Sequence, residues 1–230
     1  MNNIAKLAAA SLLALSASAG AADHLYQLNG SLSDTLGGPD LVFHGGSLGL
    51  TSYTFGQNQG LTTQFSLGSV YTIDMDFSFD THSGWQKIVD FSALAADVGM
   101  YTSGNQWNFY DVGGYTLAPA DGASARLTLT RDAGNLFTMY VNGSQIGAFV
   151  DNSNKANFGA NVANFFIDDI ATGQREAASG SVDYIRTYDR ALSGEEVGRL
   201  APPVPEPESW AMLGAGLGLL ALLRRRQRKG

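Results

Sequence analysis

Apolar and polar residues alternate without interruption between Tyr71 and Asp80. Tyr, Ile, Met and Phe occupy the odd positions of this stretch, while Thr, Asp and Ser occupy the even ones. Because side chains of a β-strand point alternately to opposite faces, the pattern predicts a half-buried strand of an antiparallel sheet. Shorter apolar runs predict further strands at 87–91, 98–101, 107–110, 125–131, 136–141, 145–150, 165–168 and 182–188.

Two turn signals separate the strands in the middle of the chain. Asn142-Gly143 lies between two strand-like runs, and this dipeptide is typical of a type I′ hairpin because both residues must take positive φ. The segment 132–135, Asp-Ala-Gly-Asn, predicts a second turn. Three consecutive antiparallel strands are therefore expected between 125 and 150.

One short helix is expected near the end of the body. Ser193 as N-cap and Glu196 three residues later form a capping box, and Leu192 and Val197 have the spacing of a hydrophobic staple. The helix must end before Pro202. Many short strands with turns between them and a single helix indicate an all-β protein, a sandwich of two antiparallel sheets.

The N-terminus has the pattern of a secretory signal peptide. Lys6 precedes an apolar run over 7–19, and the run ends in the small residues Ala-Ser-Ala at 17–19. We therefore assign residues 1–21 to a signal peptide, which implies export by the secretion machinery and cleavage by signal peptidase.

The C-terminal segment, residues 202–230, predicts a single transmembrane helix. Residues 210–223 carry no charge, but a helix of that length is only about 21 Å long, less than the hydrocarbon core of about 30 Å. Basic side chains that reach the headgroups extend the span, and basic residues stay on the cytoplasmic side. This cytoplasmic basic tail consists of Arg224, Arg225, Arg226, Arg228 and Lys229.

The segment before this helix carries a specific motif. Val204, Pro205, Glu206 and Pro207, followed by a glycine-containing apolar helix and an arginine cluster, resemble the PEP-CTERM sorting signal of Gram-negative bacteria. The resemblance implies recognition by an exosortase near Pro-Glu-Pro, in bacteria that make extracellular polysaccharide. The chain would be anchored in the inner membrane before processing and then reach the outer surface or the extracellular matrix. A permanent single-span anchor is the alternative.

The remaining body, residues 22–201, has the size of one domain. It keeps 8 of the 14 Lys and Arg residues and 19 of the 21 Asp and Glu residues, which gives a net charge of −11. Such an acidic surface argues against binding to nucleic acid or anionic membranes. The absence of cysteine excludes disulfides, zinc-thiolate sites and a thiol nucleophile.

Four segments of the body resemble one family in the order that the family has them: 25–34, 55–61, the Tyr-Val-Asn-Gly hairpin at 140–143, and 182–193. They are similar to the landmarks of LamG-like, concanavalin A-like (lectin/glucanase) domains. The resemblance implies a jelly-roll β-sandwich of two curved antiparallel sheets.

Three aromatic residues are the candidates for carbohydrate binding: Trp85, Trp107 and Tyr110. Amide side chains surround the last two, and an aromatic ring with a polar rim suits the apolar face and the hydroxyls of a sugar. The alternative is that these residues belong to the core, and we expect this for at least one tryptophan.

Calcium is the candidate ion. Acidic and amide oxygens recur in the loops, and calcium prefers such ligands. The family resemblance places the candidate ligands near the first and last strands, at Asp34 and Asp183. Solvated turns are the alternative explanation for such residues, and we favour it.

Two patterns could indicate catalysis. Residues 45–49 match G-x-S-x-G, but no helix or triad pattern follows them. Asp74, Asp76 and Asp80 share a strand face, as the acids of laminarinase-type glucanases do, but those enzymes use Glu. We therefore expect no enzyme activity, and a sandwich that binds carbohydrate or matrix. A glycoside hydrolase acting on matrix polysaccharide and a ligand-free structural matrix protein are the alternatives.

Overall fold

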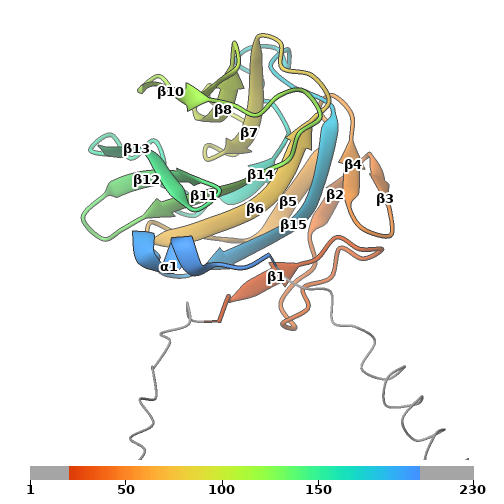
Figure 1. Ribbon diagram of the computed structural model, residues 1–230, viewed down its shortest axis with the longest axis horizontal. Coiled ribbons are helices and arrows are strands. Elements are labelled where there is room, and N and C mark those ends of the chain that lie inside the picture. The colour runs from red at the N-terminus through yellow and green to blue at the C-terminus, as the bar shows by residue number, and fades with distance from the viewer. Residues whose placement is uncertain (1–20, 203–230) are drawn as a thin grey trace, which may run out of the picture.

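The computed structural model describes residues 21–202, which form two antiparallel sheets packed face to face (Figure 1). The eight-stranded sheet has the order β13 (Ser144–Val150), β12 (Leu136–Val141), β11 (Ala125–Arg131), β6 (Tyr71–Phe79), β15 (Gly180–Tyr188), β4 (Tyr53–Phe55) and β3 (Ser47–Leu48), with β1 (His24–Tyr26) also paired to β15. The seven-stranded sheet has the order β10 (Gly113–Leu117), β9 (Gln106–Tyr110), β8 (Gly99–Ser103), β7 (Trp85–Asp90), β14 (Val162–Phe165), β5 (Gly60–Ser66) and β2 (Val42–His44). The predicted all-β sandwich is confirmed.

Aromatic side chains dominate the core between the two sheets. Phe77 of the eight-stranded sheet meets Trp107 of the seven-stranded sheet edge to face, with ring centroids 6.0 Å apart. Phe91, Phe109 and Phe137 continue the cluster, and all three are at most 1% exposed. Because aromatic rings bury large apolar areas, this core stabilises a domain that has no disulfide.

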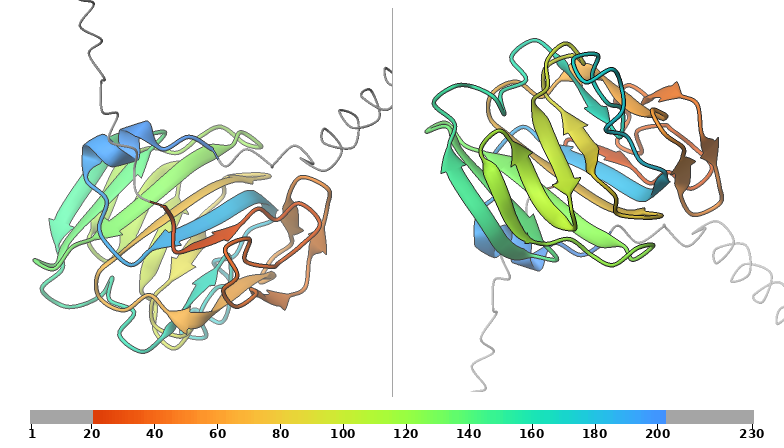
Figure 2. Two further views of the ribbon diagram at one scale, coloured as in Figure 1. Left: turned by 90° about the horizontal axis from the view of Figure 1, so that it is seen from below. Right: turned by 90° about the horizontal axis from the view of Figure 1, so that it is seen from above.

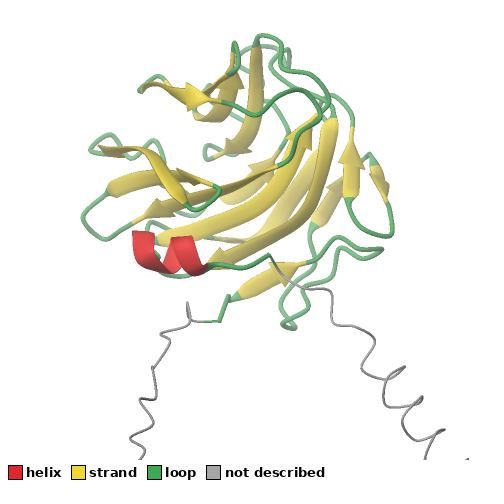
Figure 3. Cartoon of the chain, viewed as in Figure 1, coloured by secondary structure: helices red, strands yellow, loops and turns green. Residues whose placement is uncertain are grey.

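The local sequence motifs form the predicted structures. Asn142 and Gly143 have φ of 50° and 82°, as a type I′ hairpin requires. The Ser193 hydroxyl accepts from the Glu196 main-chain N–H, and the Glu196 carboxylate accepts from the Ser193 N–H, which completes the capping box. The helix α1 (Gly194–Arg199) follows, and it is the one helix in the described part of the chain (Figure 3).

The prediction that β6 is half-buried is wrong. Thr72 and Asp74, on the outer face of the sheet, are 0% exposed. Helix α1 lies over this face, as the left view of Figure 2 shows, and it sits on a small apolar cluster that contains Val197 and Tyr188. The segment that leads into α1 and side chains of β15 cover the rest, through hydrogen bonds to Thr72 and Asp74. These residues come from the end of the body, so the local alternation could not reveal that they cover the strand.

The strand predicted at 165–168 also ends earlier than expected. Phe166 has φ of 65°, and its ring stacks on Phe55 in the core with centroids 4.2 Å apart. The chain therefore turns at Phe166, and Asp168 and Asp169 enter a loop. Strand β1 overlaps the first family landmark, at 25–34, and five strands that we did not predict, β2, β3, β4, β5 and β10, complete the sheets.

The structure does not describe the predicted signal peptide before residue 21, or the predicted C-terminal segment after residue 202. The sorting motif and the transmembrane helix over 210–223 therefore lie outside the described residues. Within 21–202, no helix is long and apolar enough to cross a bilayer.

Candidate active site on the seven-stranded sheet

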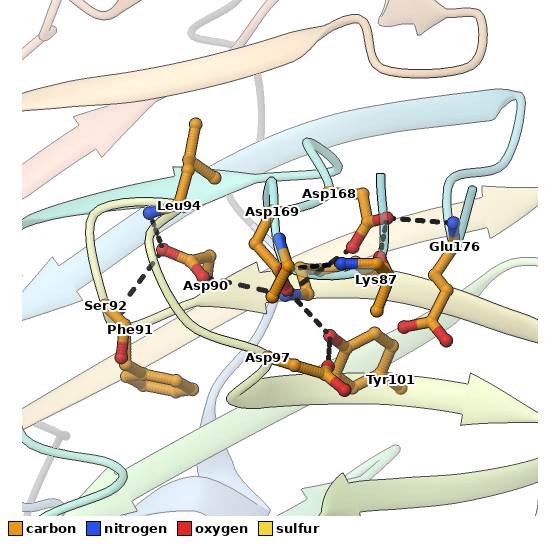
Figure 4. Close-up of polar contacts among 12 residues, drawn as sticks. Lys87, Asp90, Phe91, Ser92, Leu94, Asp97, Tyr101, Asp168, Asp169 and Glu176 are labelled. Carbon is orange, nitrogen blue, oxygen red and sulfur yellow. Dashed lines mark hydrogen bonds and ion pairs between the residues drawn. The ribbon is translucent and has the colours of Figure 1, made fainter. Parts of the chain in front are cut away.

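A buried lysine is the centre of the site. Lys87 of β7 is 0% exposed, and its ammonium donates to the Asp169 carboxylate. The nearest carboxylate oxygens of Asp90 and Asp168 both lie 3.6 Å from the Lys87 Nζ. Figure 4 shows the three carboxylates around the lysine. A buried charge is stable only when it is paired and hydrogen-bonded. The cluster around Lys87 therefore holds the acid-bearing loops against the outer face of the sheet.

Main-chain groups hold the three carboxylates in place. Asp90 accepts from two N–H groups of its own loop, those of Ser92 and Leu94. Asp168 accepts from the Glu176 N–H at 2.9 Å. Burial raises the pKa of Asp90, whereas for Asp169 the hydrogen bond and charge of Lys87 outweigh burial and lower the pKa.

Two further acids, Asp97 and Glu176, lie beside this cluster. Both are partly exposed, and Figure 4 shows their carboxyl groups on either side of the Tyr101 ring. The Tyr101 hydroxyl donates to Asp97 at 2.8 Å, and the ammonium of Lys87 lies 4.7 Å from the centre of the same ring. Burial, together with repulsion by Asp97 and Asp168, raises the pKa of Glu176 to about 7.

Aromatic side chains form the exposed edge of the site. Trp85 packs edge to face against Tyr110 and Tyr101, with ring centroids 5.4 and 5.5 Å away. Trp85 and Tyr110 are partly exposed and lie on the same outer face as Lys87. Trp107 is 0% exposed and belongs to the core. Two of the three predicted carbohydrate-binding residues are therefore brought together, and the third lies on the opposite face of its strand.

The two candidate calcium ligands have different environments. The Asp34 carboxylate is engaged by three main-chain N–H groups within 25–38 and by His24, whose Nδ1 is 2.7 Å away. The main-chain hydrogen bonds lower the pKa of Asp34 although burial alone would raise it. Asp183 is exposed on the outer face of the other sheet. Among residues 21–202, no group of three or more His, Asp or Glu side chains is arranged to hold a metal ion.

The acids of β6 have separate roles. Asp74 accepts from Arg186 at 2.8 Å and from the Tyr184 hydroxyl at 3.0 Å, so it is a buried structural anion. Asp76 is partly exposed, and Asp80 lies exposed just beyond the strand. Residues 45–49 form a loop and the two-residue strand β3, without the elbow and helix of a serine hydrolase.

Lys87, Asp97 and Glu176 were not among the predicted site residues. The sequence contains one indication of this site, because Lys87 is the lysine that lies within a predicted strand. A charged residue at such a position needs a partner of opposite charge.

The geometry can be compared with known families. A family model described as the concanavalin A-like lectin/glucanases superfamily matches residues 51–198. The chain belongs to this superfamily. A second model, the PEP-CTERM protein-sorting motif, matches residues 203–229 and marks this concanavalin A-like protein for export and for membrane-associated sorting, with recognition by an exosortase. No curated protein matches the chain.

Solved structures share the fold at low identity. Trypanosoma rangeli sialidase is 16% identical with a TM-score of 0.61, and the match covers 77% of this chain and 32% of the sialidase. Domain 4 of AbnA, a GH43 extracellular arabinanase from Geobacillus stearothermophilus, in complex with arabinotriose, is 15% identical with a TM-score of 0.56. That match covers 78% of this chain and 97% of the domain. The concanavalin A-like domain thus spans about a third of the sialidase and nearly all of the arabinanase domain.

These neighbours overturn one expectation from the sequence. We expected no enzyme activity, because neither of the two catalytic patterns fitted. The solved structures with this fold include a sialidase and a domain of an arabinanase, which are glycoside hydrolases. The expectation was wrong because it considered only the fold and the aspartates of one strand, 71–80. The acids around Lys87 come from other segments of the chain.

Proposed function

We propose that the concanavalin A-like domain acts on carbohydrate as a glycoside hydrolase, with Glu176 as the general acid and Asp97 as the second carboxyl group. The observation that carries this proposal is the placement of two partly exposed carboxyl groups, Asp97 and Glu176, on either side of the Tyr101 ring, where burial and the neighbouring acids raise the pKa of Glu176 to about 7. Most glycoside hydrolases use a pair of acids, one of which is protonated near neutral pH and donates its proton to the leaving oxygen.

The surroundings support this assignment. Tyr101 holds Asp97 through its hydroxyl, and Lys87 with its three aspartates fixes the base of the site. Preorganised groups of this kind keep their geometry while charge develops in the reaction. Asp168 and Asp169 act here as positioning residues, because they contact Lys87 and the loop backbone.

Carbohydrate binding at the aromatic edge is the second candidate function. Trp85 and Tyr110 offer apolar ring surface next to the acids. The specific observation that favours binding is that the arabinanase domain of the same fold is in complex with arabinotriose. Stacking of a sugar ring on Trp85 would place a glycosidic bond near Glu176.

The sorting motif suggests where the domain works. An exosortase that reads residues 204–207 would deliver the body to the outer surface or the extracellular matrix. The substrate in this proposal is therefore a matrix polysaccharide.

The purified protein should release reducing ends from a polysaccharide panel that contains linear arabinan and the matrix of PEP-CTERM-bearing bacteria. Glu176→Gln should lower release by about a thousandfold, as removal of a general acid does. The control is Glu195→Gln, an exposed glutamate on α1, which should act like the unchanged protein. Equal release by Glu176→Gln and the unchanged protein would falsify the catalytic assignment. Loss of retention on the glycan in Trp85→Ala tests binding separately.

A further inference from the structure

A gap in strand pairing creates a second site, on the outer face of the eight-stranded sheet. Strand β4 pairs with β15 only as far as Val182, and β1 pairs with it only from Ile185 onward. Between these positions the register of β15 against β6 shifts, so that Asp183 is an extra residue of a β-bulge. Bulges re-aim side chains and interrupt pairing. The edge of β15 is thus left open at Asp183 and Tyr184.

The gap is a pocket of about 560 Å³. Its polar wall consists of Asp76 from β6 and Asp183, together with Gln27, Asn29 and Thr51 from the loops that flank the gap. A volume between about 300 and 1,000 Å³ is typical of sites for small organic ligands. The pocket is lined further by Leu50, Tyr184 and Pro202.

Neither acid in the pocket forms an ion pair with a lysine or an arginine among the described residues. Arg186 pairs with Asp74 at 2.8 Å. Arg126 donates to the carbonyl oxygens of Val197 and Leu200, and its Nε lies 3.8 Å from Asp74. The ion pairs of both arginines are therefore with Asp74, although the charge of Arg126 also acts on Asp76 and counters part of the rise in its pKa.

The surroundings of Asp76 and Asp183 determine how readily each carboxyl group is protonated. The Oδ1 atom of Asp76 is buried without a hydrogen-bond partner in the described structure. Partial desolvation and repulsion by Asp76 raise the pKa of Asp183 although its side chain is exposed, and burial raises the pKa of Asp76. A bound cation would relieve the repulsion between the two carboxyl groups, so the pocket is suited to a positively charged ligand.

The shape and the lining select the kind of cation. Two carboxylates are too few ligands for a calcium ion, which takes six to eight oxygens. The Asn29 amide donates to Gln27 Oε1 at 3.2 Å, which leaves the remaining amide atoms and the Thr51 hydroxyl for hydroxyl groups. Leu50, which is 89% exposed, and Pro202 offer apolar surface to a ring.

We propose that this Asp76–Asp183 pocket binds an amino sugar with a free amine. The ammonium group lies between Asp76 and Asp183, the hydroxyls bond to Gln27, Asn29 and Thr51, and the apolar face of the ring packs on Leu50. This binding site lies on the opposite sheet from Glu176 and does not depend on hydrolysis there.

Calorimetry of the full-length protein in detergent, with a β-1,4-linked glucosamine tetramer as ligand, tests the proposal. The glucosamine tetramer should bind at least about tenfold more tightly than its N-acetylated form, because acetylation removes the charge that the carboxylates recognise. Asp183→Asn should weaken binding by at least about tenfold for the same reason. Asp189→Asn is the matched control, since Asp189 is exposed one residue beyond β15 and outside the pocket, and it should leave the affinity unchanged.

Several results would overturn the proposal. Equal affinity for the acetylated and free tetramers would show that the amine is not recognised, and an unchanged affinity in Asp183→Asn would place the ligand elsewhere. A tetralysine peptide that binds in an Asp183-dependent way, without binding of the glucosamine tetramer, would assign the pocket to basic peptides. Absence of binding by either probe would also refute it.

Discussion

The main-chain N–H of Lys87 donates a hydrogen bond of 2.7 Å to the carbonyl oxygen of Glu176. This bond ties the loop that precedes β15 to strand β7, at the residue whose ammonium is surrounded by three aspartates. The side chain of Glu176 is therefore held beside an acidic cluster by the backbone as well as by packing. The ion pairs of Lys87 with its three aspartates thus help to fix the position of Glu176, the proposed general acid.

Replacing the central lysine should strongly destabilise the domain. Lys87→Met leaves three buried carboxylates without their cation, and we expect a loss of about 3–5 kcal/mol in the free energy of unfolding. The control is Lys155→Met, which removes a partly exposed lysine paired with Asp111 and should cost at most about 1 kcal/mol. Urea unfolding measures both, and similar losses in the two variants would contradict the role of the cluster.

The raised pKa of Glu176 predicts a pH-dependent stability. Between the unfolded value of 4.5 and the folded value of about 7, the folded protein binds more protons at this site than the unfolded chain does. Its contribution to stability is therefore lost as the pH rises through this window. Glu176→Gln should remove the decrease, by about 1 kcal/mol once solvent screening of this partly exposed group is allowed for. Parallel stability curves between pH 4.5 and 8 for the two proteins would contradict the prediction.

The two tryptophans of the seven-stranded sheet should separate stability from binding. Trp107→Ala should cost about 3–5 kcal/mol, because the side chain is fully buried between the sheets. Trp85→Ala, at a partly exposed position, should cost less than half of that and should abolish retention on a glycan column. Thermal unfolding and affinity electrophoresis together test the pair. Retention that survives in folded Trp85→Ala protein would argue against the aromatic edge as the binding surface.

Asp74 should matter for folding and not for chemistry. Asp74→Ala leaves Arg186 without its carboxylate in a buried environment, and we expect a loss of about 3–5 kcal/mol. Asp80→Ala, at an exposed position beyond the same strand, should change stability by less than about 0.5 kcal/mol. Chemical denaturation is the measurement. An Asp74→Ala protein with unchanged stability would show that the Asp74–Arg186 pair is dispensable.

Local patterns predicted the local structure well. The alternation over 71–80 gave β6 (Tyr71–Phe79) almost to the residue, and the capping box gave the start of α1. The burial of Asp74 could not be predicted, because the side chains that enclose it, Thr128, Tyr184 and Arg186, lie far away in the sequence. Period-two reasoning could have separated Trp107 from Tyr110, since residues three apart on one strand point to opposite faces.

The candidate site was harder to predict because it is assembled from distant segments. Lys87 and Asp97 come from β7 and the loop that follows it, whereas Asp168, Asp169 and Glu176 come from the loop after β14. The pairing of β14 with β7 and further main-chain hydrogen bonds bring these segments together. The turn at Phe166, where a phenylalanine takes positive φ, has no signature in the sequence, yet it directs the second group of acids over the sheet.

Pro202, at the rim of the Asp76–Asp183 pocket, also precedes Val204 of the sorting motif by only two residues. The match to the sorting motif begins at residue 203, directly after Pro202. An exosortase that reads the motif would therefore work next to this pocket. If the pocket binds an amino sugar as proposed, the bound sugar and the sorting enzyme would compete for neighbouring space, and the sorting step would respond to the ligand that the folded body carries.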